Sequence, residues 1–304
     1  MNGRPRVSIG LPVFNGERFV AEAIDSILAQ TFTDFELIVS DNASTDRTEE
    51  ICRQYAEKDE RIRYVRNREN YGAAFNFNQT FHLSSGSYFK WVAHDDLLSP
   101  EFLQRCVDVL DHDPTVVLAY PSWAAIDEDG RQLSRGYASW DVSSSDPRVR
   151  FRRTMAMDSR GGGPIWGLIR SEVLKETRLQ PPYPHGDHVL LAELSLYGRF
   201  VEIEEPLFQH RWHAGRYVLS PSRRRMVEWW RVARRERLLS PLNRVSVLVI
   251  PVVQWVTGYL SSIYRAPIDP RAKMRCYVEV VRFSVSKLVT KAARHWEGQT
   301  QRRA

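Results

Sequence analysis

Cysteine is scarce in this chain of 304 residues, and Cys52, Cys106 and Cys276 lie far apart without the close spacing of a metal-binding motif. Such scarcity argues against a fold held by disulfides and against a cysteine-ligated zinc site, so we expect reduced structural thiols. The first residues, MNGRPRVSIG, also lack the long apolar stretch of a secretory signal peptide. The expected location is therefore cytoplasmic.

Two glycine-rich phosphate-binding motifs are missing as well. No G-x-G-x-x-G follows the first expected strand, which argues against a dinucleotide-dependent oxidoreductase, and no G-x-x-x-x-G-K-[S/T] occurs, which argues against a P-loop enzyme. The hydrophobic content of 43% and the charged content of 26% are those of a globular protein. At this length the chain forms either one large domain or a core domain with an appendage.

Positive charge is concentrated in the last part of the sequence. Residues 222–304 contain 18 Lys or Arg and 5 Asp or Glu, a net charge of +13, whereas residues 1–221 contain 25 and 32, a net charge of −7. The overall charge of +6 thus comes from a basic tail. This asymmetry favours an acidic partner for the tail, either anionic lipid or nucleic acid, and the alternative is a solvated basic face.

Strand-like and helix-like periods alternate over the first 120 residues, which is the pattern of an α/β fold with a mostly parallel sheet. Apolar residues recur at helical spacing after Glu17, and Asp46 and Ser99 are expected to cap two later helices. The expected strands are residues 6–14, 35–40, 61–65, 87–93 and 115–120, and the expected helices begin near residues 17, 46, 72 and 99.

Polar clusters follow three of these strands: FNGE at 14–17, DNASTD at 41–46 and HDD at 94–96. Open sheets of parallel strands bind ligands at the carboxyl ends of their strands. The three clusters therefore predict a single ligand-binding edge of the sheet.

The adjacent carboxylates Asp95 and Asp96 follow an apolar strand, where they repel each other unless a positive charge neutralises them. Mg²⁺ and Mn²⁺ prefer oxygen ligands, commonly one or two carboxylates with substrate phosphates completing the shell. The pair thus predicts a divalent metal at the sheet edge. The alternative is a solvated loop that merely precedes the next helix.

Three segments together resemble a known family: VSIGLPVFNGERF with the DNASTD cluster (7–46), NYGAAFNFN (70–78) and HDD (94–96). Their order and spacing are similar to those in the nucleotide-binding half of the family-2 inverting glycosyltransferases, over roughly the first 125 residues. The resemblance implies the GT-A fold, a Rossmann-like mixed, mostly parallel sheet flanked by helices. It also implies a nucleotide-sugar donor and Mg²⁺ or Mn²⁺ as cofactor.

The resemblance assigns donor-binding residues by position. Three positions depart from the family pattern, because Asn42, Phe77 and Ala93 stand where relatives commonly have Asp, Arg and Asp. An Asn amide can both donate and accept, so base recognition by residue 42 remains expected. The implied nucleotide-sugar-binding residues are Pro12, Phe14, Glu17, Asp41, Asn42, Asn70, Gly72, Asn78, Asp95 and Arg211.

Metal ligation is implied for Asp96, with Asp95 facing the ribose or a metal-bound water. After the strand-like segment at 199–208, His213 is the position where relatives use a residue to hold the diphosphate or the metal, and the alternative for this histidine is a structural or exposed role. The Q-x-x-R-W motif of processive relatives fails by one residue at Gln209, which disfavours processive polymerisation.

Inverting transfer needs a base near the acceptor hydroxyl, and the resemblance implies Asp187, which precedes the apolar helical segment 189–196. The alternative is an ordinary helix N-cap, since Asp is favoured there for local reasons. The segment GGGPIWG (161–167) either lets an acceptor approach or forms a loop, and Trp166 either stacks on a sugar or joins the core.

The sequence divides into a predicted glycosyltransferase domain at 1–221, with a nucleotide-binding half (1–125) and an acceptor half (126–221), and a basic helical extension at 222–304. Residues 245–264 carry no charge, but Pro251 and several polar residues favour an interfacial or packed helix over a membrane span. Arginines, Trp229 and Trp230 before this segment suit an anionic membrane surface, and the alternative is a helical subdomain or dimer contact in solution.

The expected function is transfer of one sugar from a nucleotide-diphosphate sugar to the hydroxyl of a glycan or lipid-linked acceptor, in polysaccharide, glycolipid or other cell-surface glycan synthesis. The enzyme would act in the cytoplasm or on the inner face of the plasma membrane, with no nucleic-acid partner. Two alternatives stay open: a sugar-phosphate nucleotidyltransferase, and a membrane-associated scaffold of the same fold without turnover.

Overall fold

A computed structural model of the chain describes residues 4–136, 141–157, 163–183, 185–214 and 250–300. Its strands form a nine-stranded sheet in the order β3-β2-β1-β4-β8-β6-β9-β5, with β7 beside β6. The strands are β1 (Val7–Val13), β2 (Phe35–Asp41), β3 (Ile62–Arg66), β4 (Tyr88–Trp91), β5 (Leu97–Leu98), β6 (Val116–Ile126), β7 (Gln132–Gly136), β8 (Leu168–Arg170) and β9 (Arg199–Arg211). The helices are α1 (Val20–Leu28), α2 (Thr48–Lys58), α3 (Ala73–His82), α4 (Phe102–His112), α5 (Pro147–Met155), α6 (Ser171–Glu176), α7 (Gly186–Tyr197), α9 (Ile250–Arg265), α10 (Pro270–Thr300) and the short 3₁₀ helix η1 (Pro164–Trp166).

The parallel part of the sheet is the β3-β2-β1-β4 segment, and β1 lies at its centre with both faces buried. On one face, Ile9 and Leu11 pack with residues of α1 and α4, and each such side chain contributes about 1.5–3 kcal/mol through burial. On the other face, α3 lies so close to Gly10 that an added Cβ would be 2.3 Å from Thr80 Oγ1. The predicted α/β fold with helices on both faces is confirmed.

The strand order reverses at β1, because the chain adds β2 and β3 on one side of it and β4 on the other. Ligands of open α/β sheets bind at the carboxyl ends of the strands beside such a reversal. In this chain the loops that follow β1 and β4 contain residues 14–19 and 92–96. These are the two polar clusters that flank the reversal point.

The rest of the sheet is mixed. β6 and β9 are parallel partners, whereas β8 joins β4 to β6 in antiparallel fashion and β5 pairs antiparallel with β9. In the β5–β9 ladder Leu97 lies opposite Gln209, so continuing the register one residue places Asp96 opposite His210. This pairing connects the polar loop after β4 to the end of β9.

The helix that follows β5 begins later than predicted. Ser99 does not cap it: the backbone N–H of Ser99 donates to the carbonyl of Leu207, which extends the β5–β9 ladder by one residue. Because strand pairing fixes the backbone there, α4 starts only at Phe102. The other helices that were predicted in the first half begin within a few residues of their expected starts.

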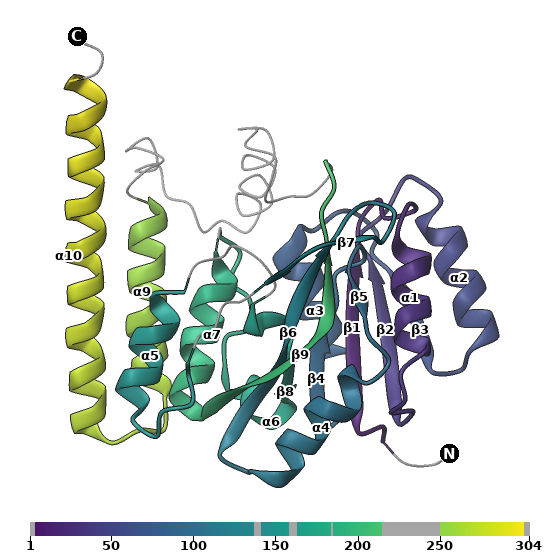
Figure 1. The fold of residues 1–304 in the computed structure, drawn as a ribbon, viewed down its shortest axis with the longest axis horizontal. Coiled ribbons are helices and arrows are strands. Elements are labelled where there is room, and N and C mark those ends of the chain that lie inside the picture. The colour runs from purple at the N-terminus through teal and green to yellow at the C-terminus, as the bar shows by residue number, and fades with distance from the viewer. Residues whose placement is uncertain (1–3, 137–140, 158–162, 184, 215–249, 301–304) are drawn as a thin grey trace.

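A helical layer of α5, α7, α9 and α10 lies at the end of the molecule opposite α2 (Figure 1). Its core includes Phe151, Val189, Tyr259, Ile263 and Val280, one or more from each helix. The part of the expected interfacial segment that the structure describes is thus a helix packed on the body. No helix in the described ranges is long and apolar enough to cross a membrane. Trp229, Trp230 and most of the basic stretch before α9 lie outside the described residues.

Candidate functional site

The loops that follow β1 and β2 are bonded to each other at the predicted edge. The N–H of Asn15 donates to Ser44 Oγ at 2.9 Å, and the N–H of Thr45 donates to Asn15 Oδ1 at 2.8 Å. Asn15 adopts a positive φ of 52°, which Asn tolerates better than most residues. Phe14, at the end of β1, is 43% exposed beside this junction, whereas Pro12 is buried within the strand opposite Ser40.

The carboxylates of Glu17 and Asp46 bind backbone N–H groups across the junction between the loops that follow β1 and β2. Asp46 accepts from the N–H of Glu17 at 3.1 Å and from the N–H of Thr48 at 3.0 Å, while Glu17 accepts from the N–H of Arg47 at 3.0 Å. Burial acts to raise the pKa of Asp46, but the hydrogen bonds from Thr48 and Glu17 outweigh it and lower the pKa below its usual value. Both carboxylates therefore order the start of α2, and the predicted contact of Glu17 with the donor stays a prediction.

Asp41 and Asn42, at the end of β2, are both buried. The Asp41 carboxylate accepts from the N–H of Ser44 at 2.8 Å and from the hydroxyl of Tyr64 at 2.7 Å. Burial first, and then the neighbouring Asp41 carboxylate, raise the pKa of the Tyr64 hydroxyl above its usual value. Asp41 thus ties the carboxyl end of β2 to the loop that follows it and to β3.

The Asn42 amide uses all of its hydrogen-bonding capacity within the chain. Its oxygen accepts from Asn67 Nδ2 at 3.1 Å and from the N–H of Tyr71 at 3.0 Å. Its nitrogen donates to Asn70 Oδ1 at 2.7 Å and to the carbonyl of Gly72 at 3.2 Å. Two donors and two acceptors are the most that an amide offers. In this structure Asn42 closes the loop 70–72 and has no group left for a nucleotide base.

The loop at residues 70–72 contains a backbone conformation that favours glycine. Gly72 has φ 90°, a left-handed value that favours glycine, and its N–H donates to Asn70 Oδ1 at 2.9 Å. The loop therefore depends on Asn42, Asn70 and Gly72 together. Direct nucleotide contact by these three stays a prediction.

Asn78 is occupied by a distant part of the chain. Its Nδ2 donates to the carbonyl of Gln180 at 2.9 Å, and its Oδ1 accepts from the N–H of Gln180 at 3.0 Å. These two hydrogen bonds hold α3 against the segment that leads to α7. Asn78 thereby positions the region of Asp187, a contact that its place in the sequence did not reveal.

Asp96 lies buried at the end of the loop after β4, with 1% exposure. One of its oxygens, Oδ1, lies 3.0 Å from His210 Nδ1 and accepts from the N–H of Arg211 at 2.9 Å. These contacts follow from the β5–β9 register. The other oxygen, Oδ2, is buried and has no hydrogen-bond partner in the described chain.

Asp95 pairs with His213, whose Nε2 lies 2.9 Å from Asp95 Oδ2. Burial acts to raise the pKa of Asp95, but the hydrogen bond from His213 and the charges of His94 and His213 lower it to about 2. The His213 ring also packs against Phe19 at a centroid distance of 4.8 Å. Asp95 is therefore a carboxylate under all ordinary conditions.

Arg211 is fully buried, and its guanidinium binds three parts of the chain. It donates to the carbonyl of Asp95 at 2.9 Å, to the carbonyl of Glu128 at 2.7 Å and to the carboxylate of Glu22 at 2.6 Å. A contact of Arg211 with a diphosphate, as predicted, would require these bonds to rearrange. In this structure it is the brace that fixes the Asp95–Asp96 loop.

The carboxylate oxygens at this edge suit a hard divalent cation as ligands. Asp96 Oδ2 is an unpartnered buried carboxylate oxygen, and Asp95 lies next to it in the chain. Mg²⁺ and Mn²⁺ need only one or two such carboxylates when substrate phosphates and water supply the remaining ligands. His213 could join the shell by exchanging its bond to Asp95.

Asp187 occupies the first turn of α7, beside His185 and His188. β9 is parallel to β6 and follows α7 directly. Helix α7 therefore runs antiparallel to both strands, and its first turn lies toward their carboxyl ends. The ligand atoms of His185, Asp187 and His188 lie within 4.8 Å of one another, so this trio could hold a metal ion. Among the described residues, no hydrogen bond or ion pair joins Asp187 to the Asp95–Asp96 loop, and its role as base stays a prediction.

Lys90, on β4, is a buried amine that the sequence did not single out. Its Nζ donates to the carbonyl of Trp166 at 2.9 Å and lies 4.0 Å from the ring centroid of Phe102. Burial lowers its pKa to about 7. Trp166 itself stacks on Phe208 at 6.0 Å and belongs to the core, which favours the core alternative for this residue.

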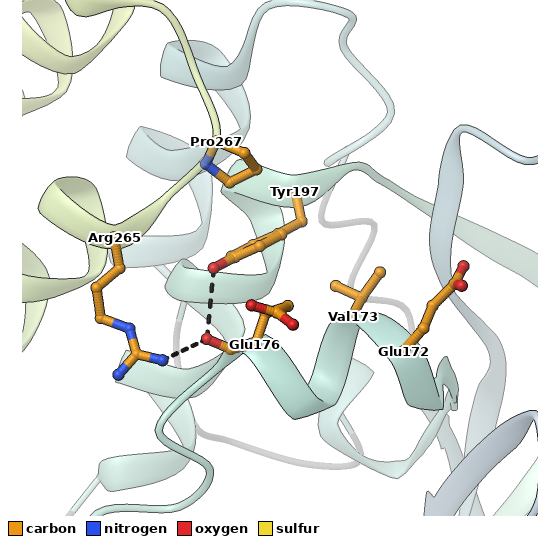
Figure 2. A pocket seen from close by; sticks show the side chains of 6 residues that line it. All are labelled: Glu172, Val173, Glu176, Tyr197, Arg265 and Pro267. Atoms are coloured by element: carbon orange, nitrogen blue, oxygen red, sulfur yellow. Dashed lines mark hydrogen bonds between the residues drawn. The ribbon is translucent and has the colours of Figure 1, made fainter.

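One open pocket of about 370 Å³ lies at the C-terminal end of α7, between α6 and the end of α9 (Figure 2). There Arg265 donates to the carbonyl of Glu176 at 2.5 Å, and the hydroxyl of Tyr197 lies 3.5 Å from the same oxygen. The pocket contains no residue of the sheet edge. It belongs to the junction between the body and the α9–α10 pair.

Sequence comparison gives a family match over more than half of the chain. The model of the family described as "Glycosyl transferase family 2" matches residues 8–177. An uncharacterised glycosyltransferase of Rickettsia typhi is 38% identical over 130 residues, which are 42% of this chain and 40% of that protein. The chain therefore spans well under half the length of this curated relative.

Two solved structures have the same fold. TarS of S. aureus (residues 1–349), solved with UDP-GlcNAc, has a TM-score of 0.58 and 18% identity, and the match covers 94% of this chain and 92% of TarS. The mannosyltransferase PcManGT of Pyrobaculum calidifontis, solved with GDP-Man and Mn²⁺, has a TM-score of 0.50 and 19% identity, with coverage of 96% and 81%. At these identities the likeness concerns the fold, which is GT-A.

Proposed function

Because this chain belongs to glycosyl transferase family 2, we propose that it transfers a single sugar from a nucleotide-diphosphate sugar to an acceptor hydroxyl with inversion at the anomeric carbon. The observation that carries the proposal is Asp96, a buried carboxylate with one oxygen anchored and the other unpartnered at the point where the strand order reverses. That is where open α/β sheets bind nucleotides.

The donor would lie across the edge formed by Phe14, the 70–72 loop and the Asp95–Asp96 loop. The exposed ring of Phe14 offers a flat apolar surface for a base or ribose. Mg²⁺ or Mn²⁺ bound through Asp96 would neutralise the charge on the departing diphosphate. TarS and PcManGT, which were solved with UDP-GlcNAc and with GDP-Man and Mn²⁺, support this class of donor and this class of metal.

Asp187 would act as the general base. Its carboxylate takes the proton of the acceptor hydroxyl while the acceptor oxygen forms a bond to the anomeric carbon and the bond to the diphosphate breaks on the opposite face. The bidentate contact between Asn78 and Gln180 supports this role, because it fixes the segment before Asp187 against α3. The acceptor would be a glycan or a lipid-linked sugar, on the cytoplasmic side of the membrane.

A thermal-shift panel tests donor binding first. UDP-, GDP-, dTDP- and CDP-sugars are each added with and without Mn²⁺ to the native chain, to Asp96→Ala and to the control Asp129→Ala, whose carboxylate is exposed in a turn. We expect one nucleotide to raise the Tm only with metal, and only when Asp96 is present. Equal donor-induced shifts in Tm for Asp96→Ala and the control would show that Asp96 takes no part in donor binding.

Release of nucleoside diphosphate tests transfer. With the donor from the panel and a mixture of glycan acceptors, the native chain should release the nucleotide and Asp187→Asn should lose about 10²–10⁴-fold in rate while keeping the donor-induced shift. Full activity of Asp187→Asn would exclude it as the base. Donor binding without release in the native chain would favour the scaffold alternative.

A further inference from the structure

Helix α10 carries an unusual row of exposed apolar side chains. Met274, Val278, Val281 and Val285 are 63%, 45%, 62% and 54% exposed. Their spacing of four, three and four residues places them on one face of an α-helix. At a rise of about 1.5 Å per residue the row extends over about 16 Å.

The opposite face of α10 is firmly packed, so the exposed row is a fixed feature of the surface. Cys276 and Val280 are buried in one cluster with Phe151 of α5 and Tyr259 of α9. Glu279 is also buried on that side, where Arg148 of α5 and Arg282 pair with it at 3.5 Å and 3.2 Å. The rotation of the helix about its axis is thereby set by the core.

Arginines line one flank of the apolar row. At about 100° per residue, Arg271, Arg275 and Arg282 project between about 60° and 100° to one side of Met274. All three are exposed, and Arg271 and Arg275 have no side-chain partner among the described residues. The acidic residues of this stretch are taken up elsewhere: Glu279 is buried, and Asp269 accepts from the backbone N–H groups of Arg271 and Ala272.

Helix α9 repeats the pattern in shorter form. Val253, Leu260 and Tyr264 are 52%, 38% and 76% exposed, and Thr257 completes the same face with its hydroxyl donating to the carbonyl of Val253 at 2.8 Å. The sequence of α9 contains no Asp or Glu. The outward faces of α9 and α10 up to residue 286 are called here the α9–α10 face. They combine apolar and cationic side chains, and neither helix has an exposed Asp or Glu in this range, whereas the exposed Asp269 lies in the turn between the helices.

We propose that the α9–α10 face docks on the surface of an anionic lipid bilayer. The apolar rows enter the boundary between headgroups and acyl chains, and the flanking arginines bind lipid phosphates. Charge complementarity selects this occupant. A second copy docked through the same face would bring the arginines of α10 against those of the other copy, and neither helix row contains an exposed carboxylate to neutralise them.

The docking mode is peripheral. None of the described helices has the length and apolar character needed to cross a bilayer, and α9 and α10 are each packed on the body along one side. The α9 row lies within the uncharged segment 245–264 that the sequence indicated, and the α10 row extends the contact beyond that segment. Docking does not depend on the transfer reaction, so neither donor nor acceptor is needed to measure it.

Vesicle flotation with the full chain tests the proposal. Vesicles of phosphatidylcholine alone and of phosphatidylcholine mixed with phosphatidylglycerol are compared at low and high salt. We expect binding to the mixed vesicles only, weakened by salt. The double variant Arg271→Gln with Arg275→Gln should bind about 30-fold more weakly, since each arginine at such a surface contributes about fivefold.

A matched control removes the same charge at the other end of the molecule. Arg53→Gln with Arg63→Gln alters two exposed arginines near α2 and β3 and should bind as the native chain does. Val281→Asp should abolish binding while leaving the Tm nearly unchanged, because Val281 is 62% exposed. Equal losses in the two double variants would reduce the effect to net charge and overturn the proposal.

Sedimentation in the absence of vesicles tests the remaining alternative, which is a second copy of the chain docked on the α9–α10 face. If the native chain is a dimer that Val281→Asp dissociates, and if neither form floats with anionic vesicles, the α9–α10 face is a contact between copies and the lipid proposal is wrong. A monomer that floats with the mixed vesicles supports it.

Discussion

Lys90 gives the structure a measurable dependence of stability on pH. Its side chain is fully buried, and burial lowers the pKa of its amine from 10.5 to about 7. Between these values the unfolded chain binds a proton at Lys90 and the folded chain does not. The free energy of unfolding should therefore rise with pH across this window, by about 1.4 kcal/mol per pH unit.

The magnitude follows from the two pKa values. From about pH 7.5 to about pH 9.5 the contribution of Lys90 to the free energy of unfolding should rise by about 2.5 kcal/mol. Replacement by Met keeps an apolar chain of similar length in the site and removes the titration. Lys90→Met also loses the hydrogen bond to the carbonyl of Trp166. The loss of this bond changes the free energy of unfolding by the same amount at every pH, so it does not contribute to the difference in pH dependence.

Urea unfolding of the metal-free chain measures this slope. The native chain, Lys90→Met and the control Lys58→Met, in which an exposed lysine of α2 is changed, are each unfolded at the two pH values. Burial raises the pKa of the three cysteine thiols, so they lower stability at high pH in all three proteins. Cys52 and Cys276 contribute equally to the three profiles, whereas the contribution of Cys106 also depends on the charge of Lys90. Parallel pH profiles for the native chain and Lys90→Met would refute the assignment of a neutral buried amine.

Three further predictions concern the candidate site. Asn42→Asp removes the donor to Asn70 and Gly72, so urea unfolding should show a loss of about 1–3 kcal/mol; an Asp variant of unchanged stability that binds a different nucleotide would mean that residue 42 contacts the base instead. Asn78→Ala should lower kcat by about 10–100-fold with little change in the donor KM, because it loosens the segment before Asp187 rather than the donor site; a rise in donor KM alone would contradict this. The pKa of Asp95 is lowered to about 2, so its stabilising contribution is present above its unfolded pKa and is lost as the pH falls through the folded one; acid unfolding between about pH 5 and about pH 2.5 should cost the native chain about 1.5 kcal/mol more than Asp95→Asn.

The sequence predicted the features that local chemistry encodes. Alternating apolar periods located β1 to β4 and their helices, since burial on both faces of a parallel sheet requires near-continuous apolar strands. The Asp95–Asp96 pair could be found because two like charges follow a buried strand beside the other polar clusters, where their repulsion is costly unless a positive charge neutralises it.

The partners of these residues were not predictable in the same way. His210 lies beside Asp96 only because β5 pairs with β9 in one register, and Asn78 meets Gln180 only because the chain returns to α3. The fully bonded amide of Asn42 is likewise a tertiary result. Contacts across a hundred or so residues depend on strand register, which periodicity along the chain does not specify.

The β5–β9 pairing also determines when the site can exist during folding. The contact between Asp96 and His210 joins residues 114 positions apart, and the entropy of closing so long a loop delays it relative to local structure. Until β9 is in place, Asp95 and Asp96 form a loop without their histidine and backbone partners. On the ribosome, therefore, the acidic loop emerges long before its partners, and the proposed binding of metal and donor should appear as a late, cooperative event when β9 joins the sheet.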